Sequence, residues 1–325
     1  MNQLGNYLSD RKWIKQLISW SKRVVLPGFD GLPLYDVMVF FFKEAFKGQL
    51  TNQAAAISFF FLLAMPPTCI FLFTLLPYIP LSNLEHTIYI LAREITPNHR
   101  TFQIVKGIIH DFLHTQRTGL LSLAFLLAIF YSSTAVLGIL RSFNKNHPVF
   151  RRRNVFQQRW TAIKINCLLI LLVIVSIILM VAQSSVFRSI LHHFNLTNEA
   201  VRLFIGLARW LIIILLFFTV ISLIYTYGPA VKKRWRFITA GSTLATFLTI
   251  LSTLGFSFYV NHFSRYNKIY GSIGSLIVLM VWIYINSFVL LIGFELNASI
   301  EMIRQEAEAR IEKEDIEEGD WSGLT

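Results

Sequence analysis

The chain has 325 residues, a formal net charge of +12 and a composition that is 54% hydrophobic but only 15% charged. Soluble domains carry about 25% charged residues. This composition therefore excludes an ordinary soluble protein and favours one that resides in a membrane.

Six stretches of the chain contain no Asp, Glu, Lys, Arg or His, and each exceeds the roughly 20 residues that a helix needs to cross a bilayer. Their apolar residues are continuous rather than alternating, which favours helices over a β-barrel. We therefore predict an all-α bundle of six transmembrane helices within a domain at 51–298, between a segment at 1–50 and a tail at 299–325. The predicted spans are 54–79, 119–140, 165–187, 210–231, 237–261 and 269–294.

The N-terminal segment contains two amphipathic stretches. In 11–25, Trp13, Leu17 and Trp20 share one helical face, and most basic residues lie elsewhere. Pro27 and Gly28 end this stretch, and a Phe-rich stretch at 35–49 leads into the first span. We expect both to lie on the cytoplasmic membrane surface as helices.

The distribution of basic residues predicts the orientation. If the N-terminus is cytoplasmic, the cytoplasmic segments hold 21 Lys and Arg residues and the outer segments hold nine. Positive charge accumulates on the cytoplasmic side of membrane proteins. We expect a multi-pass protein of a bacterial cytoplasmic membrane with both termini in the cytoplasm.

The first span contains two adjacent prolines, Pro66 and Pro67. Proline removes a backbone donor and bends a helix, so this pair is either a packing bend or a hinge. The following outer loop, 80–118, has two apolar stripes separated by Thr96-Pro97-Asn98, and we expect an extracytoplasmic pair of amphipathic helices there. His110 and His114 share a face of the second helix, but no further ligands complete a metal site, and we expect no metal.

The fifth span is rich in hydroxyl side chains. At about 100° per residue, seven of its eight Ser and Thr residues fall on one face. This face is either the wall of an internal pathway or a surface for helix association. The candidate pathway residues are Thr239, Ser242, Thr246, Thr249, Thr253 and Ser257.

The sixth span combines small and polar residues on two faces, which predicts a central helix in the bundle. The candidate packing residues are Gly271, Gly274, Ser275, Gly293 and Asn297, and the candidate pathway residues are Tyr270, Tyr284 and Glu295. Glu295 adjoins the apolar run without a nearby basic cluster. An ionisable group at membrane depth is costly and commonly functional, although a hydrated position at the cytoplasmic end is the alternative.

Two charged segments flank the bundle. The basic cluster Arg151-Arg152-Arg153 permits nucleic-acid binding, but it is more typical of an orientation signal that touches anionic lipid headgroups. The chain after Glu295 holds nine acidic and three basic residues, and part of it can continue the last span as a helix. We expect contact with membrane lipids and no nucleic acid. A homo-oligomer and envelope protein partners both stay possible.

The first span contains the motifs Ala54-Ala55-Ala56-Ile57-Ser58-Phe59-Phe60 and Pro66-Pro67. The last span contains Tyr270-Gly271-Ser272-Ile273-Gly274, Trp282-Ile283-Tyr284 and Gly293-Phe294-Glu295-Leu296-Asn297. These motifs resemble those of the YihY/BrkB family of bacterial membrane proteins. Phe294 departs from the small Ala that is more frequent in that family. The resemblance covers about 35–300 and implies the same six-span layout. The family is named for a serum-resistance factor and also carries an old ribonuclease BN label.

Three functions are compatible with these observations. The first is transport or handling of an amphiphilic, lipid-like or small solute in envelope maintenance, and the second is a non-catalytic scaffold that recruits envelope proteins. The third, a membrane-bound ribonuclease, fits poorly because the loops between spans on the expected cytoplasmic side are basic and carry no acidic residues. No phosphate-binding glycine loop or nucleophile elbow occurs, so we expect neither an enzyme nor a cofactor.

Overall fold

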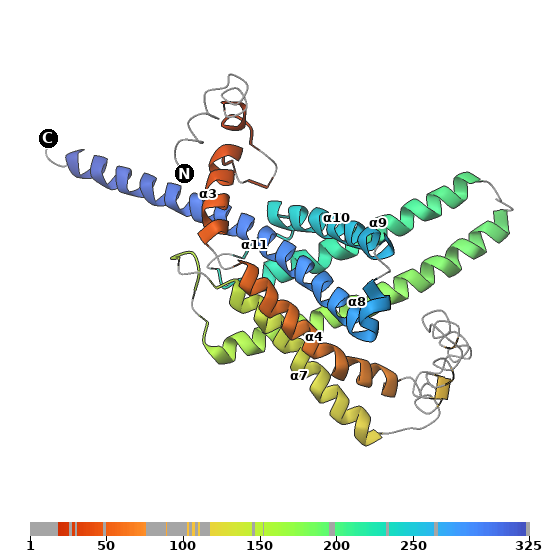
Figure 1. The fold of residues 1–325 in the computed structure, drawn as a ribbon. Coiled ribbons are helices and arrows are strands. Elements are labelled where there is room, and N and C mark those ends of the chain that lie inside the picture. Colours follow the sequence, from red (N-terminus) through yellow and green to blue (C-terminus); the bar gives the residue numbers. More distant parts are fainter. Residues whose placement is uncertain are drawn as a thin grey trace.

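A computed structural model describes most of the chain, and Figure 1 shows its arrangement. In parts of the helices, among them 177–194, 199–206, 261–262, 266–275 and 312–322, only the backbone is described. The described residues are 19–25, 28–29, 31–47, 50–75, 118–144, 147–151, 153–194, 199–231, 234–262 and 266–322, with isolated positions between 89 and 110.

The described chain is helical almost throughout. Its long helices are α3 (Leu34–Lys47), α4 (Leu50–Leu75), α7 (Thr118–Ser142), α8 (Val155–Phe194), α9 (Glu199–Tyr227), α10 (Ala240–His262) and α11 (Tyr266–Ser322). All of these except α3 contain an apolar window long enough to cross a membrane. The prediction of an all-α polytopic membrane protein with six spans is therefore confirmed.

Three helices extend well beyond the charge-free runs that predicted them. The helix α8 begins ten residues before 165, at Val155, and α9 begins at Glu199, before 210. The helix α11 continues from Tyr266 through the acidic tail to Ser322. A run defined by the absence of charge ends where the bilayer is expected to end, whereas a helix continues wherever its backbone can bond internally. Conversely, α9 ends at Tyr227, before 231, because Gly228 and Pro229 interrupt it.

The helix α11 lies at the centre of the bundle. It packs against α10 and α4, while α4 pairs with α7, and α8 contacts both α7 and α9. Figure 1 shows α11 running through the bundle and projecting past α3 at its C-terminal end. The central position agrees with the small and polar residues on several faces of this helix.

An aromatic cluster forms the core at the end of the bundle where α7 and α9 end. Phe294 of α11 is 1% exposed and stacks on Phe143, with 4.0 Å between the ring centroids. Trp235 of the α9–α10 connection and Phe150 of the α7–α8 connection also contact Phe294, with 5.7 Å and 6.2 Å between the ring centroids. These contacts hold both connections against α11 and so position the segment that enters α10.

The crossing of α10 and α11 is very close because glycines occupy it. A Cβ added to Gly293 would lie 2.6 Å from the carbonyl oxygen of Gly241 and 2.5 Å from the hydroxyl oxygen of Tyr225. The Tyr225 hydroxyl donates a hydrogen bond to the Leu290 carbonyl oxygen at 2.5 Å. Three helices thus meet at one point, which is typical of small residues in membrane bundles.

The N-terminal segment packs on the same end of the bundle. Val37 and Phe41 of α3 and the preceding Phe29 are buried against Leu296 and Ile300 of α11. Gly28 has a φ of 91°, and a Cβ there would lie 3.1 Å from the Ala240 nitrogen. This left-handed turn of a glycine brings the segment directly onto the start of α10.

Two predictions fall mainly on residues that the structure does not describe. The first amphipathic stretch, 11–25, is described only from Ser19 onward, and the extracytoplasmic helix pair at 80–118 is described only at isolated positions and from Thr118. The second amphipathic stretch corresponds to α3.

Candidate functional site

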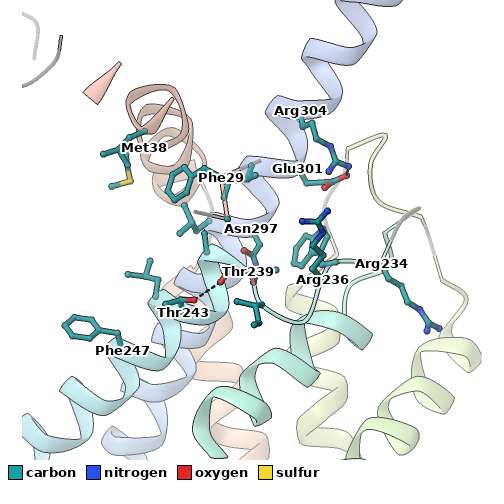
Figure 2. A pocket seen from close by; sticks show the side chains of 18 residues that line it. Phe29, Met38, Arg234, Arg236, Thr239, Thr243, Phe247, Asn297, Glu301 and Arg304 are labelled. Carbon is teal, nitrogen blue, oxygen red and sulfur yellow. Dashed lines mark hydrogen bonds and ion pairs between the residues drawn. The ribbon is translucent and has the colours of Figure 1, made fainter. Parts of the chain in front are cut away.

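A cavity of about 1110 Å³ lies where the N-terminal segment, the α9–α10 connection, α10 and α11 meet. Figure 2 shows the side chains around it. The lining residues are Gly28, Phe29, Leu34, Met38, Arg234, Trp235, Arg236, Ile238, Thr239, Ala240, Thr243, Leu244, Phe247, Leu296, Asn297, Ile300, Glu301 and Arg304. The lining is thus mostly apolar, with a small number of charged and polar groups.

The charged groups gather at one side of the cavity. In Figure 2 the side chain of Arg236 is directed toward the side of the cavity on which Glu301 and Arg304 lie, whereas Arg234 points away from it. Arg304 donates to the Glu301 carboxylate at 2.7 Å, and Glu301 is 6% exposed. Arg234 instead lies over the ring of Tyr227, 5.4 Å from its centroid.

The opposite side of the cavity is apolar and exposed on the protein surface. Phe247 is 64% exposed and Ile238 is 70% exposed. In Figure 2, Phe247 lies far from the charged corner of Arg236, Glu301 and Arg304. Phe247 belongs to α10, which is one of the six helices long and apolar enough to cross a membrane.

The first turn of α10 is capped by protein groups. Thr239 and Ser242 bond reciprocally, each backbone nitrogen donating to the other's hydroxyl oxygen, at 3.0 Å and 3.1 Å. The Gly241 nitrogen donates to Asn297 Oδ1 at 2.7 Å, and Asn297 Nδ2 donates to Thr239 Oγ1 at 2.9 Å. Asn297 therefore ties α11 to the N-terminus of α10, where unpaired amides otherwise accumulate.

The structure separates the predicted hydroxyl face into parts. Only Thr239 and the neighbouring Thr243 line the cavity. Ser242, Thr246 and Thr249 are buried deeper, and the Thr246 hydroxyl donates to the Ser242 carbonyl of its own helix at 2.7 Å. This bond leaves the Thr246 hydroxyl in the packed interior of the bundle, outside the cavity.

The remaining hydroxyls of α10 differ in exposure. The Thr253 oxygen is buried and makes no hydrogen bond within the described part of the chain. Ser257 is exposed. The pathway role of the deeper hydroxyls stays a prediction.

The predicted residues of the sixth span lie at different depths of α11. Glu295 is only 2% exposed, so it is not a hydrated surface carboxylate, and it does not line the cavity. Tyr284 is half-buried and stacks on Phe288, with 6.3 Å between ring centroids. The side chains of the others lie outside the described residues; these are Tyr270, Gly271, Gly274 and Ser275.

The double proline lies inside α4, which continues without a break from Leu50 to Leu75. Pro66 is exposed and Pro67 is half-buried. The Thr68 hydroxyl donates to the Ala64 carbonyl oxygen at 2.7 Å, a bond of the kind that satisfies backbone near a membrane proline. The hinge role of the two prolines stays a prediction.

Sequence reasoning missed most of the cavity. Arg236 was counted only as an orientation signal, and Glu301 and Arg304 belong to the segment assigned to the tail. Arg236 and the Glu301–Arg304 pair lie in different sequence segments, so no local spacing connects the arginine to the pair. The one available signal was the polar cluster around Thr239 and Asn297, which marks the α10–α11 contact beside the cavity.

The described residues contain no group of three or more His, Cys, Asp or Glu side chains that could hold a metal ion. The basic cluster is described at Arg151 and Arg153. Arg153 is engaged with backbone, donating to the carbonyl oxygens of Gly228 at 2.8 Å and Pro229 at 3.3 Å.

Comparisons with known proteins give the relationship of the whole chain. It is 30% identical over 264 residues to the putative ribonuclease-like protein YfkH of Bacillus subtilis, covering 79% of this chain and 94% of that protein. It is 36% identical over 80 residues to a UPF0761 membrane protein of Tolumonas auensis, covering 25% of this chain and 26% of that protein. It is 33% identical over 127 residues to a UPF0761 membrane protein of Vibrio campbellii, covering 36% of this chain and 40% of that protein. No solved structure matches.

The model of the family described as virulence factor BrkB matches residues 41–317. The match contains every described span and extends into the part of α11 that follows the last candidate span. The chain therefore belongs to the virulence factor BrkB family of membrane proteins.

Proposed function

We propose that the chain binds an amphiphilic, lipid-like molecule at the cytoplasmic face of the bacterial cytoplasmic membrane and moves or handles it in envelope maintenance, without covalent catalysis. The observation that carries this proposal is the two-sided cavity. Its apolar side is exposed along α10, a helix that lipid would surround if it spans the membrane, and its charged side is formed by the α9–α10 connection and α11.

The size and lining of the cavity suit an amphiphile. Small-molecule sites measure about 300–1,000 Å³ and combine apolar walls with a few polar groups, and this cavity, at about 1110 Å³, lies just above that range. A molecule with a polar head and an apolar chain can satisfy both sides at once. A small polar solute would leave Phe247, Leu244 and Met38 without an apolar partner.

The position of the cavity along α10 also supports a ligand from the membrane. The candidate span begins at Ala240, so Arg234 and Arg236 precede it while Phe247 lies two turns inside it. A headgroup at the arginines would thus be at the level of lipid headgroups. The ligand could enter sideways from the leaflet.

The buried hydroxyls of α10 offer an extension of this site toward the bilayer centre. Thr246, Thr249 and Thr253 follow the cavity along the helix. Hydroxyl groups can bond to their own helix at this depth, as that of Thr246 does, and they remain polar groups that a ligand can contact. We propose that these hydroxyls line the route of the headgroup when the bundle opens.

The test is to fill the cavity. Thr243→Trp places a bulky ring in the cavity, and Leu251→Trp is the matched control, because Leu251 is 56% exposed on the same helix and does not line the cavity. The full chain in lipid nanodiscs is irradiated with a phospholipid that carries a photoreactive acyl chain. We expect labelled peptides around Met38 and Phe247, labelling reduced about tenfold in T243W and unchanged in L251W, since exclusion from an apolar pocket is worth at least 1.4 kcal/mol.

Equal labelling of wild type and T243W would contradict the proposal. Proteoliposomes containing a headgroup-labelled phospholipid then distinguish binding from movement between leaflets. Movement that T243W blocks and L251W does not block would support transport.

A scaffold is the second candidate, and the observation that favours it is the projecting end of α11. This helix continues beyond the bundle (Figure 1), and Ile311 on it is 58% exposed. An exposed helix with apolar positions can recruit a partner protein. Truncation after Arg304 separates the two functions, because it removes the projecting end and retains the residues that line the cavity.

A further inference from the structure

We propose that the cavity selects phospholipids with a net negative headgroup, whose phosphate is bound by Arg236 together with Arg304. This inference rests on the proposed function, because it assigns a chemical class to the molecule that the cavity binds. The ligand is an anionic phospholipid of the cytoplasmic leaflet.

The charged corner has a surplus of positive charge. Arg236, Arg304 and one carboxylate, that of Glu301, line this side of the cavity. Arg304 is already paired with Glu301 at 2.7 Å and with Glu308, which lies outside the lining, at 3.4 Å. The surplus charge is therefore that of Arg236. Arg236 is exposed and forms no ion pair or hydrogen bond with any other described residue. Its full charge is therefore available to a ligand.

Arginine is the side chain best suited to phosphate. Its planar guanidinium presents several donors that match two phosphate oxygens at once, and such charged hydrogen bonds are roughly twice as strong as neutral ones. Arg236 precedes α10 in a connection that Trp235 anchors in the aromatic core, where Trp235 is 8% exposed. The backbone that carries Arg236 is thus held in place before a ligand arrives.

The start of α10 does not compete for the phosphate. Helix N-termini commonly bind anions through unpaired amides, but here the Gly241 and Ser242 nitrogens already donate to Asn297 and Thr239. Thr243 also uses its hydroxyl, which donates to the Thr239 carbonyl oxygen at 3.0 Å. The arginines are consequently the groups that determine which headgroup fits.

Glu301 makes the selection sensitive to the net charge of the headgroup. The buried Glu301 carboxylate would repel a negatively charged headgroup, but the charge of Arg304, with which it pairs, already compensates the charge of this carboxylate. A zwitterionic choline or ethanolamine headgroup would bring an ammonium group toward Arg236. An anionic glycerol headgroup brings none, so it gains more from the surplus guanidinium.

The experiment measures headgroup preference with the full chain. Wild type in phosphatidylcholine nanodiscs is photolabelled with a trace of photoreactive phosphatidylglycerol or photoreactive phosphatidylcholine. We expect labelling in the cavity to favour phosphatidylglycerol about tenfold, which corresponds to about 1.4 kcal/mol. The preference should weaken as salt rises, because exposed charges are screened.

Three variants identify the source of the preference. Arg236→Gln should abolish the preference for phosphatidylglycerol. Glu301→Gln should increase this preference severalfold, because the substitution removes the carboxylate while the amide retains hydrogen-bonding capacity. Arg310→Gln is the control, since Arg310 is also exposed but does not line the cavity. A merely structural role for these residues would not produce opposite changes in R236Q and E301Q.

Equal labelling by the two lipids in wild type, or an unchanged preference in R236Q, would overturn the headgroup assignment and leave amphiphile binding intact. Absence of cavity labelling by either lipid would overturn the proposed function itself. Displacement of phosphatidylglycerol by inorganic phosphate at the same concentration would show that the site binds free phosphate, and it would overturn the assignment to lipid.

Discussion

Two adjacent residues of α11 have opposite requirements for size. Gly293 lies at the crossing with α10, where a Cβ would be 2.6 Å from both the Gly241 carbonyl oxygen and the Ala245 Cβ. Phe294, the next residue, fills the aromatic core against Phe143. The Phe that departs from the small residue expected in this family thus has a definite place here, because Phe143, Phe150 and Trp235 surround it.

At this scale we predict that Gly293→Ala destabilises the bundle. The added methyl group forces backbone apart, and overpacking of this kind costs about 1–3 kcal/mol. Gly255→Ala in α10 is the control, since a Cβ there meets nothing within 4 Å and alanine favours the helix. Thermal unfolding of the purified protein in detergent measures both, and equal midpoints for the two variants would refute a tight crossing at Gly293.

At the scale of elements, the side chain of Arg153 helps to join the α7–α8 connection to the α9–α10 connection. Arg153, which precedes α8, donates to the carbonyl oxygens of Gly228 and Pro229, which directly follow α9. A cation at the C-terminal end of a helix also interacts favourably with the helix dipole. A short bridge between Phe150 and Val231 joins the same two connections. Burial, and then the charge of Arg234, lower the pKa of Arg153 from its ordinary value, so the backbone bonds offset a cost in desolvation and repulsion.

We predict that Arg153→Gln lowers the unfolding midpoint, because glutamine is too short to reach both carbonyl groups. Hydrogen bonds from a charged group contribute about 1.5–3 kcal/mol. Arg151→Gln is the matched control, since the Arg151 side chain is exposed and only its backbone nitrogen bonds across, to Ala230 at 2.6 Å. A loss of stability in R151Q as large as that in R153Q would indicate a general effect of charge instead of this contact.

At the scale of the whole molecule, the arrangement of six spans fixes the side on which the cavity lies. The start of α10, the end of α9 and the C-terminal part of α11 lie at one end of the bundle (Figure 1). The excess of basic residues in the segments at this end predicts that it is cytoplasmic. The cavity would then contact the inner leaflet.

Reporter fusions test this orientation. We expect a phosphatase that works only outside the cytoplasm to be inactive when fused after residue 232 or at the C-terminus, and active when fused after residue 264. The physical reason is that positively charged loops are not carried across the membrane. The reverse pattern would place the cavity in the outer leaflet, and opposite results for the two cytoplasmic fusions would contradict the count of spans.

Much of the fold could be predicted from the sequence because hydrophobic runs of membrane length have few alternatives. Lipid offers no partner for backbone groups, so a continuous apolar run must be helical. The same reasoning could not locate the ends of α8 and α11, since helices continue past the bilayer. Nor could it decide between the two interpretations of the α10 hydroxyls, because both place polar groups on one face.

The sequence by itself determined the class, the number of spans and the family, since these follow from local composition and motifs. Only the tertiary structure decided where a ligand could fit. The cavity joins Phe29, Arg236, Thr243 and Arg304 from four separate segments, and the close approach of α10 to α11 at Gly241 and Gly293 determines their distances. Such a site depends on how helices cross, and helix crossing is a property of packing between segments that no single segment encodes.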